Sequence, residues 1–273
     1  MADVKQIGGK ATEPEDELAG SEAPLLEHLV ELRKRLIYSA VTIVALMAFC
    51  FIFASTIYDW LLIPYKNAVP GANLIFTAPQ ELFFTYLNVA LFGAIFLGFP
   101  MVASQIYMFV APGLYKHERR AFIPYLIATP IFFVAGAGLV YFVVLPMALH
   151  FFAGMQTADI EMLTSVSEYL GLAMLLILAF GICFQLPVIL TLLAQIDLIH
   201  VDLLKKGRRY AIVGILIFAA FITPPDPISQ IGLAVPMYLL YELSILSVRM
   251  IEQRRAAALA AQEAELNGSS SSE

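Results

Sequence analysis

Residues 33–58 read RKRLIYSAVTIVALMAFCFIFASTIY, a basic triplet followed by an uncharged and mostly apolar run at 36–58. A helix of about 20 apolar residues crosses the roughly 30 Å hydrocarbon core of a bilayer. A basic cluster beside such a run is typical of the cytoplasmic flank of a membrane helix. This stretch therefore predicts a helical protein embedded in a membrane.

Five further uncharged runs follow the first, in a chain of 273 residues that is 60% hydrophobic and only 14% charged. They cover 82–115, 121–149, 169–196, 210–225 and 227–241. The last two are short and span only if flanking residues help or the bilayer thins locally. We expect six transmembrane helices, with five or four as the alternative if the short runs fail to cross.

The placement of basic residues predicts the orientation. Of the 16 Lys and Arg residues, only Lys66 falls on one side of the six expected spans, and all the others fall on the opposite side. Lys and Arg are enriched in cytoplasmic loops, so we expect both termini in the cytoplasm. The expected fold is all-α, a concave bundle bent by prolines inside the runs. These are Pro100, Pro130, Pro146, Pro187 and Pro236.

Three regions are expected along the chain. Residues 1–24 are acidic and read as a disordered cytoplasmic tail, 25–250 form the transmembrane domain, and 251–273 form a cytoplasmic tail. The leucines at 25, 29, 32 and 36 predict an amphipathic helix leading into the first span. Residues 59–81 predict an interfacial cap on the external side. Two pairs, Thr77 with Gln80 and Ser165 with Glu168, resemble capping boxes for the second and fourth spans.

Signatures of enzyme chemistry are weak in this sequence. The four histidines lie scattered along the membrane flanks without the spacing of metal ligands. The residues around Gly8, Gly9 and Lys10 fail the phosphate-loop pattern. We therefore expect no enzyme, no cofactor, no metal ion and no nucleic-acid partner.

Gln185 lies inside the fourth run, where an unpaired amide loses several kcal/mol of hydration, on the order of 2–7 kcal/mol. One interpretation is a local hydrogen bond to a neighbouring helix backbone. The other is a functional polar site at the membrane midplane, as in a small-molecule or ion transporter. Asp226 follows Thr223-Pro224-Pro225 between the two short spans, a pattern typical of a solvated turn.

Two glutamates lie inside basic clusters at the cytoplasmic rim. Glu31 precedes Arg33, Lys34 and Arg35, and Glu118 lies between His117 and Arg119. Internal pairing is one explanation, since Glu31 and Arg35 are one helical turn apart, although such a pair contributes only about 0.3–0.5 kcal/mol. A binding role for the two carboxylates is the other.

Several segments resemble a known family. HLVELRKRL at 28–36, FVAPGLYKHERR at 109–120 and TPPD at 223–226 closely resemble the TatC family, the receptor subunits of the twin-arginine protein translocase. The resemblance runs from about residue 25 to 250 and includes YFVV at 141–144 and PMY at 236–238.

The resemblance implies a function and partners. It implies a multi-pass protein of the bacterial cytoplasmic (inner) membrane that recognises paired-arginine signal peptides on folded precursor proteins. With single-span subunits of the TatA and TatB type, and as a homo-oligomer within a larger complex in the lipid, it would support export driven by the proton-motive force.

The resemblance also implies roles for individual residues. Glu31 and Glu118, with Arg33 and Arg119 in the same clusters, would form the signal-peptide site. Gln185, Thr223 and Gln230 would contact a partner helix, although the family commonly has a glutamate at the position of Gln185. Four further positions match residues used for activity or structure: Pro64, Phe109, Tyr141 and Asp226.

Overall fold

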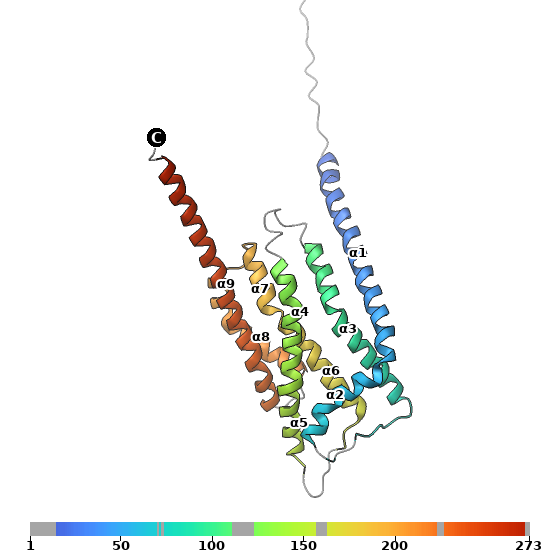
Figure 1. The fold of residues 1–273 in the computed structure, drawn as a ribbon. Helices are drawn as coiled ribbons and strands as arrows, with labels where there is room; N and C mark the ends of the chain where they lie inside the picture. The colour runs from blue at the N-terminus through green and yellow to red at the C-terminus, as the bar shows by residue number, and fades with distance from the viewer. Residues whose placement is uncertain are drawn as a thin grey trace, which may run out of the picture.

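The computed structural model describes residues 15–69, 71, 74–110, 123–156, 163–222 and 227–270. These residues form a bundle of helices (Figure 1). In chain order the helices are α1 (Glu15–Ile52), α2 (Ala54–Ala68), α3 (Glu81–Val110), α4 (Ile123–Leu139), the π-helix η3 (Val140–Val144), α5 (Leu145–Ala153), α6 (Val166–Cys183), α7 (Leu186–Gln195), α8 (Val201–Ile222) and α9 (Pro227–Ser270). The first turns of α1 and the last turns of α9 lie at one end, here called the terminal end, and α2 and α5 lie at the other, the far end (Figure 1).

Helix α1 lies along α3, and two glycines of α3 allow the approach. A Cβ on Gly98 would lie 2.7 Å from Cδ1 of Ile43, and one on Gly93 would lie 3.1 Å from Sγ of Cys50. Small residues of this kind let membrane helices pack closely. The chain then turns at Phe53 into α2, which crosses the far end and packs on α3, α5 and α6. The first part of the predicted interfacial cap, residues 59–68, is therefore helical.

Five stretches are long and apolar enough to span a membrane by length and composition. They are His28–Ile52, Glu81–Phe109, Pro124–Ala153, Val166–Gln195 and Gln230–Ala258. They correspond to the first, second, third, fourth and sixth expected spans. The fifth corresponds to α8, which has four basic residues at 205, 206, 208 and 209, before its apolar part.

The sixth span is longer than expected, because the sequence run ends at the charge of Glu242 whereas the helix continues past it. The Glu242 carboxylate pairs with the Arg208 guanidinium of α8 at 2.7 Å and accepts a hydrogen bond from the Tyr238 hydroxyl at 2.8 Å. The Tyr241 hydroxyl donates to the Leu204 carbonyl at 2.7 Å. These contacts join α8 and α9 into a hairpin.

Two of the spans are interrupted. The third contains the π-helix η3 immediately before Pro146, and the fourth breaks at Phe184 and Gln185, just before Pro187. A proline supplies no N–H to the carbonyl four residues earlier, which accounts for the break before α7. Pro100, Pro130 and Pro236 lie within continuous helices.

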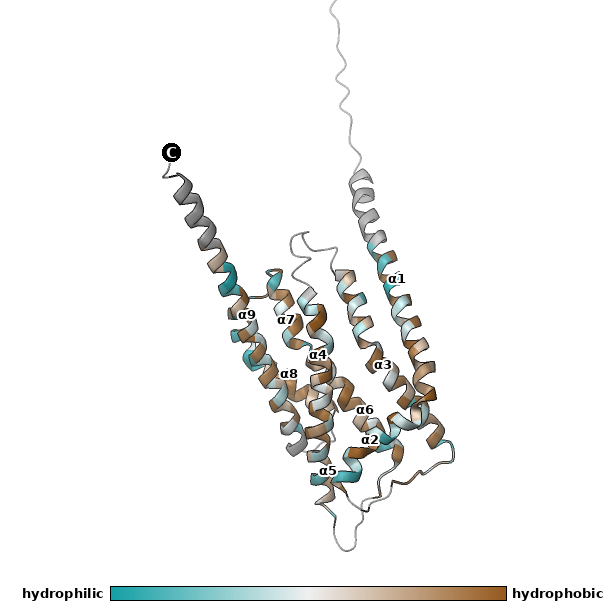
Figure 2. Cartoon of the chain, viewed as in Figure 1, coloured by the Kyte–Doolittle hydropathy of each residue, from teal (hydrophilic) through white to brown (hydrophobic). Residues whose placement is uncertain are grey.

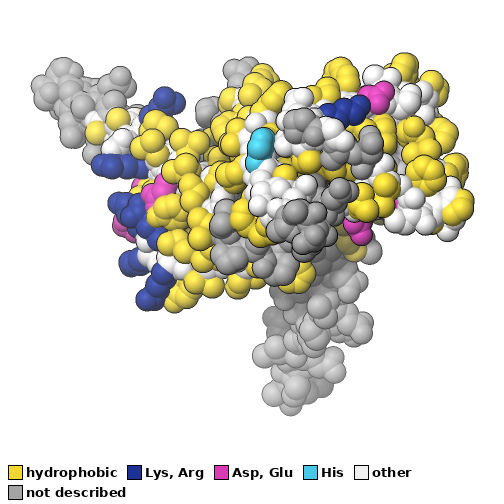
Figure 3. All heavy atoms as spheres, turned by 90° about the horizontal axis from the view of Figure 1, so that it is seen from below, with side chains coloured by type: hydrophobic (Ala, Val, Ile, Leu, Met, Phe, Trp, Pro, Cys, Tyr) yellow, Lys and Arg dark blue, Asp and Glu magenta, His cyan; other side chains and the backbone are white. Residues whose placement is uncertain are grey.

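The main core centres on α6 and takes side chains from α2, α3, α5 and α9, with Tyr65 and Phe180 among its fully buried residues. Many large apolar side chains face outward, among them Phe142 at 75% and Phe221 at 90% exposure. Figure 2 shows that hydrophobic residues fill the middle of the bundle while hydrophilic ones collect toward its ends. Viewed from the far end, the sides are largely hydrophobic and Lys and Arg gather beside α8 and α9 (Figure 3). This outer surface suits a lipid environment.

The described tails are helical where they border the bundle. Helix α1 begins at Glu15, inside the region 1–24 that was expected to be a tail, and α9 continues to Ser270.

Candidate functional site

Near the middle of α1, where the helix passes the end of α3, a partly exposed carboxylate is held by an arginine. Nη2 of Arg35 lies 3.0 Å from Oε1 of Glu31, and the two side chains are 26% and 31% exposed. Nη1 of Arg35 donates to Oε1 of Gln105 at 3.2 Å and lies 3.4 Å from Sδ of Met108, both on α3. Arg35 therefore orients Glu31 and at the same time joins α1 to α3.

A second contact joins α1 to the end of α3. The rings of His28 on α1 and Phe109 on α3 stack with centroids 4.2 Å apart and planes 19° apart. Phe109 thus positions the end of α3 beside this part of α1, while Arg33, two residues after Glu31, is exposed. Glu118 and Arg119 lie outside the described residues, a few positions after the end of α3.

The geometry leaves the Glu31 carboxylate able to bind a further cation. Arg35 engages Oε1, and no described residue forms a hydrogen bond to Oε2. Carboxylates bind guanidinium groups through paired, charge-assisted hydrogen bonds. The internal pair predicted as an alternative is present, and it occupies only one of the two carboxylate oxygens.

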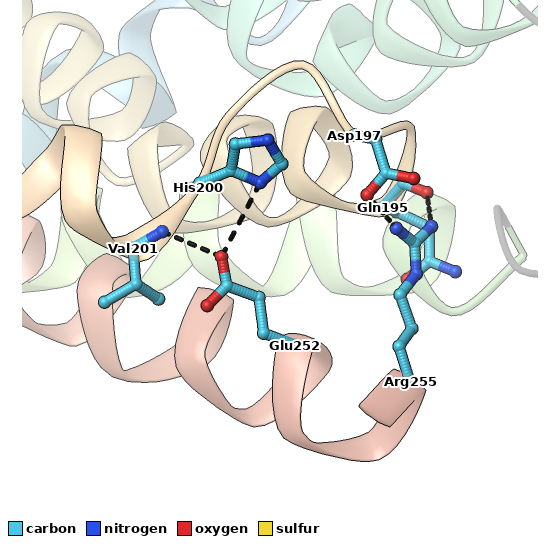
Figure 4. A network of polar contacts seen from close by, with 6 residues as sticks. All are labelled: Gln195, Asp197, His200, Val201, Glu252 and Arg255. Atoms are coloured by element: carbon cyan, nitrogen blue, oxygen red, sulfur yellow. Dashed lines mark hydrogen bonds and ion pairs between the residues drawn. The ribbon is translucent and has the colours of Figure 1, made fainter. Parts of the chain in front are cut away.

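A polar network on the same end of the bundle fixes the turn between α7 and α8 against α9 (Figure 4). Oε1 of Glu252 accepts a hydrogen bond from the Val201 backbone at 2.8 Å and lies 3.8 Å from Nδ1 of His200. The Arg255 guanidinium contacts the Asp197 carboxylate and the Gln195 carbonyl. Asp197 has φ 58°, a left-handed conformation that aspartate tolerates better than most residues. No sequence pattern predicted this network.

Pro64 and Tyr141, two positions singled out from the sequence, meet at the far end. Pro64 is buried in α2 and cannot donate to the Trp60 carbonyl four residues earlier. The Tyr141 hydroxyl donates to that carbonyl at 2.7 Å. The Tyr169 hydroxyl donates to the next carbonyl, that of Leu61, also at 2.7 Å. These residues hold α2 in place and lie at the opposite end from Glu31.

Sequence reasoning missed Glu81, which is only 9% exposed. Its carboxylate accepts hydrogen bonds from Thr77 and Ala78 before α3 and from Ser165 and Ser167 at the start of α6. Both predicted capping boxes were wrong. Thr77 pairs with Glu81 rather than Gln80, and the Ser165 hydroxyl turns to Glu81 instead of capping its own helix. The signal available in the sequence was a glutamate directly before the uncharged run at 82–115.

The Gln185 amide lies inside the bundle and is only 5% exposed. Nε2 donates to the Thr129 carbonyl of α4 at 3.1 Å and to the Gly181 carbonyl at 3.3 Å. The Gly181 carbonyl needs this donor because the Gln185 backbone N–H has turned to Ile182. The local hydrogen bond foreseen as one interpretation is therefore present. Oε1 is buried with no hydrogen-bond partner among the described residues.

Gln230 holds the start of α9 to α8, since its Nε2 donates to the Leu216 carbonyl at 3.1 Å. Thr223 and Asp226 lie outside the described residues. Within the described part of the chain, no group of three His, Cys, Asp or Glu side chains is placed to bind a metal ion.

Comparison with known proteins agrees with the resemblance seen in the sequence. The family model "Sec-independent protein translocase protein (TatC)" matches residues 27–236. The chain belongs to the TatC family. TatC of Magnetococcus marinus is 44% identical over 244 residues, covering 89% of this chain and 90% of its own length. TatC of Escherichia coli K12 is 35% identical over 223 residues, covering 81% and 86%.

A solved structure supports the same assignment. The crystal structure of the twin-arginine translocase receptor TatC superposes with a TM-score of 0.75 at 35% identity, over 82% of this chain and 98% of that one. TatC membership with this match supports the fold of six transmembrane helices, with α8 as the fifth. The chain is a multi-pass membrane component of Sec-independent protein translocation. A transporter site at Gln185, the alternative function, gains no support, because the amide nitrogen is already bound to two carbonyls.

Proposed function

We propose that this chain is the receptor for paired-arginine export signals, and that its terminal end faces the cytoplasm of a bacterial cell in the inner membrane. The basic residues support this orientation, since Arg33, Lys34 and Arg35 lie in α1 just before its apolar run, on the side of the terminal end, and Lys66 lies at the far end, in α2. Receptor function requires no catalysis, and we propose that the protein is not an enzyme.

The observation that carries the proposal is the geometry of Glu31. Its carboxylate is partly exposed at the cytoplasmic rim, is oriented by Arg35, and keeps Oε2 for a ligand. Contacts from Arg35 and His28 bring the end of α3 beside it, and Glu118 follows that end in sequence. Two carboxylates on neighbouring segments can bind two guanidinium groups at once. A lysine ammonium lacks the planar fork of donors that pairs with both oxygens of a carboxylate. Arg33 and Arg119 would contact the backbone or acidic groups of the precursor.

The test is export of a folded reporter with a paired-arginine signal in cells that lack this protein and are supplied with variants of it. Glu31→Ala and Glu118→Ala should each abolish most export while the variant remains in the membrane. Glu168→Ala, which removes an exposed carboxylate from the far end, serves as the matched control and should export normally. Normal export by both Glu31→Ala and Glu118→Ala would refute the site.

We further propose that single-span partners of the TatA and TatB type bind along α8 and the start of α9, within a larger homo-oligomeric complex that uses the proton-motive force. Gln230 lies in the first turn of α9, and Thr223 directly follows α8 in the sequence. Oε1 of Gln185 is a buried acceptor that a polar partner residue can satisfy after a small opening of the bundle. Cysteines at 223 and 230 should crosslink to a partner helix in membranes. A cysteine at Ser55 in α2 is the control and should not.

A further inference from the structure

A groove opens between α4, α7 and α9 in the half of the bundle nearest the terminal end. It has a volume of about 280 Å³ and is lined by apolar side chains that include Ala128, Phe132, Val188 and Met250. From α9 it receives Ser247, Met250, Ile251 and Arg254, the spacing of a single helix face. Two of its hydroxyls already donate to the helix backbone, Ser247 to the Leu243 carbonyl and Thr191 to the Pro187 carbonyl.

One cation lies at the rim of this groove. Arg254 is exposed, and its guanidinium forms no hydrogen bond or ion pair with any described residue. Its neighbour Arg255 is instead bound to Asp197 and the Gln195 carbonyl (Figure 4). Tyr125 lines the groove from the first turn of α4. Apolar walls therefore lead to a site with an arginine and a tyrosine.

We propose that this groove binds an anionic phospholipid of the cytoplasmic leaflet, with the phosphate on Arg254 and part of one acyl chain along Ala128, Phe132 and Val188. The guanidinium fork matches phosphate oxygens, and basic pockets between membrane helices on the cytoplasmic side select anionic headgroups. The volume is at the lower limit of about 300 Å³ for ligand pockets, which suits one chain segment rather than a whole lipid. The assignment to the cytoplasmic leaflet rests on the orientation proposed above. The groove is a feature of the structure and does not depend on that orientation.

Charge and shape both point to a lipid rather than a soluble ligand. Apolar side chains on the helices that form the groove face outward, among them Ile127 and Ile131 of α4 and Ile189 of α7, so lipid chains reach it directly. The single unpaired cation stands beside apolar walls, an arrangement that matches a molecule with one charged end and a long apolar body.

The test uses the purified full-length chain in mild detergent, titrated with phosphatidylglycerol or phosphatidylcholine of identical chains and measured by native mass spectrometry. The wild type should retain phosphatidylglycerol in preference to phosphatidylcholine. Arg254→Gln should weaken phosphatidylglycerol retention about fivefold, the effect of one basic residue near a membrane surface. Arg249→Gln is the control, because Arg249 is also exposed on α9 but does not line the groove, and it should retain lipid like the wild type.

A second variant separates the groove from the charge. Ala128→Phe fills the groove without altering Arg254, and it should also lower phosphatidylglycerol retention while the thermal melting of the protein stays within a few degrees of the wild type. Equal retention by the wild type and both groove variants would overturn the proposal. So would equal binding of the two lipids, or displacement of the lipid by a single-span partner peptide at stoichiometric amounts. The lipid titration contains no signal peptide, so a negative result would contradict the lipid site without bearing on the proposed receptor function.

Discussion

The Tyr141 hydroxyl donates a 2.7 Å hydrogen bond to the Trp60 carbonyl, the carbonyl that Pro64 leaves without its helical donor. The proline in α2 and the tyrosine in η3 therefore act as one unit, although 77 positions separate them in sequence (141 − 64). Tyr141 belongs to the π-helix η3, so the irregular segment of the third span carries the side chain that contacts α2. Irregular turns of this type occur frequently at sites with a specific role.

Tyr141→Phe removes this donor and should lower the free energy of unfolding by about 1 kcal/mol. In a Pro64→Ala background the loss should be smaller, because residue 64 then supplies an N–H to the Trp60 carbonyl. The measurement is a double-mutant cycle from unfolding in mixed micelles. Tyr169→Phe is the control, since its acceptor is the Leu61 carbonyl and its cost should not depend on residue 64. Strictly additive effects of Pro64→Ala and Tyr141→Phe would refute the coupling.

Glu81→Gln should destabilise the far end strongly. The carboxylate accepts hydrogen bonds from segments preceding α3 and opening α6, and a hydrogen bond to a charged group contributes about 1.5–3 kcal/mol. In Glu81→Gln an NH₂ group replaces one of the two acceptor oxygens, and this NH₂ group would face the N–H and O–H donors that now bind the carboxylate. Thermal unfolding of the purified protein should show a clear decrease for Glu81→Gln and no change for Glu168→Gln, whose carboxylate is exposed. A wild-type melting temperature for Glu81→Gln would contradict the stabilising role of the hydrogen bonds to the Glu81 carboxylate.

The sequence predicted the membrane fold well because apolar length and basic flanks are local properties. It did not predict the hydrogen bonds to the Glu81 carboxylate. Ser165 and Ser167 are 84 and 86 positions away in the sequence and reach that carboxylate only through the tertiary fold. The sixth span was underestimated for the same reason, because Glu242 is tolerated only with Arg208 beside it.

The candidate site was predicted in part. Glu31 could be recognised from its basic surroundings, and its pairing with Arg35 follows from helical spacing. The contact of Arg35 with Gln105 requires knowledge of how α1 packs on α3. The pairing of Pro64 with Tyr141 likewise needed the register between α2 and η3.

Gln185→Leu should destabilise the protein by about 1–3 kcal/mol, because the Thr129 and Gly181 carbonyls lose a shared buried donor. Signal-peptide binding at the terminal end should remain. If the amide also serves a partner helix, Gln185→Leu should additionally weaken co-purification with single-span subunits. The readouts are thermal unfolding and pull-down of tagged partners. An unchanged melting temperature would show that the two carbonyls do not depend on Gln185.

Arg208→Glu should disrupt the α8–α9 hairpin, since it places two carboxylates together where the wild type has a 2.7 Å ion pair. The loss should be at least about 1 kcal/mol, more than for a solvated pair, because the partners lie at a membrane helix. The reversed pair Arg208→Glu with Glu242→Arg should recover much of the stability. Protease resistance of the C-terminal helix in membranes provides the measurement, and failure of the reversed pair to improve on Arg208→Glu would contradict the role of the pair.

The central claim is that Glu31 binds the paired arginines of export signals. The most direct measurement is the affinity of a labelled paired-arginine signal peptide for the purified chain, with a paired-lysine peptide alongside. Glu31→Ala should weaken binding of the paired-arginine peptide about 10-fold or more, which corresponds to about 1.4 kcal/mol, and Glu168→Ala should leave it unchanged. Equal affinity of the wild type and Glu31→Ala for that peptide would contradict the claim.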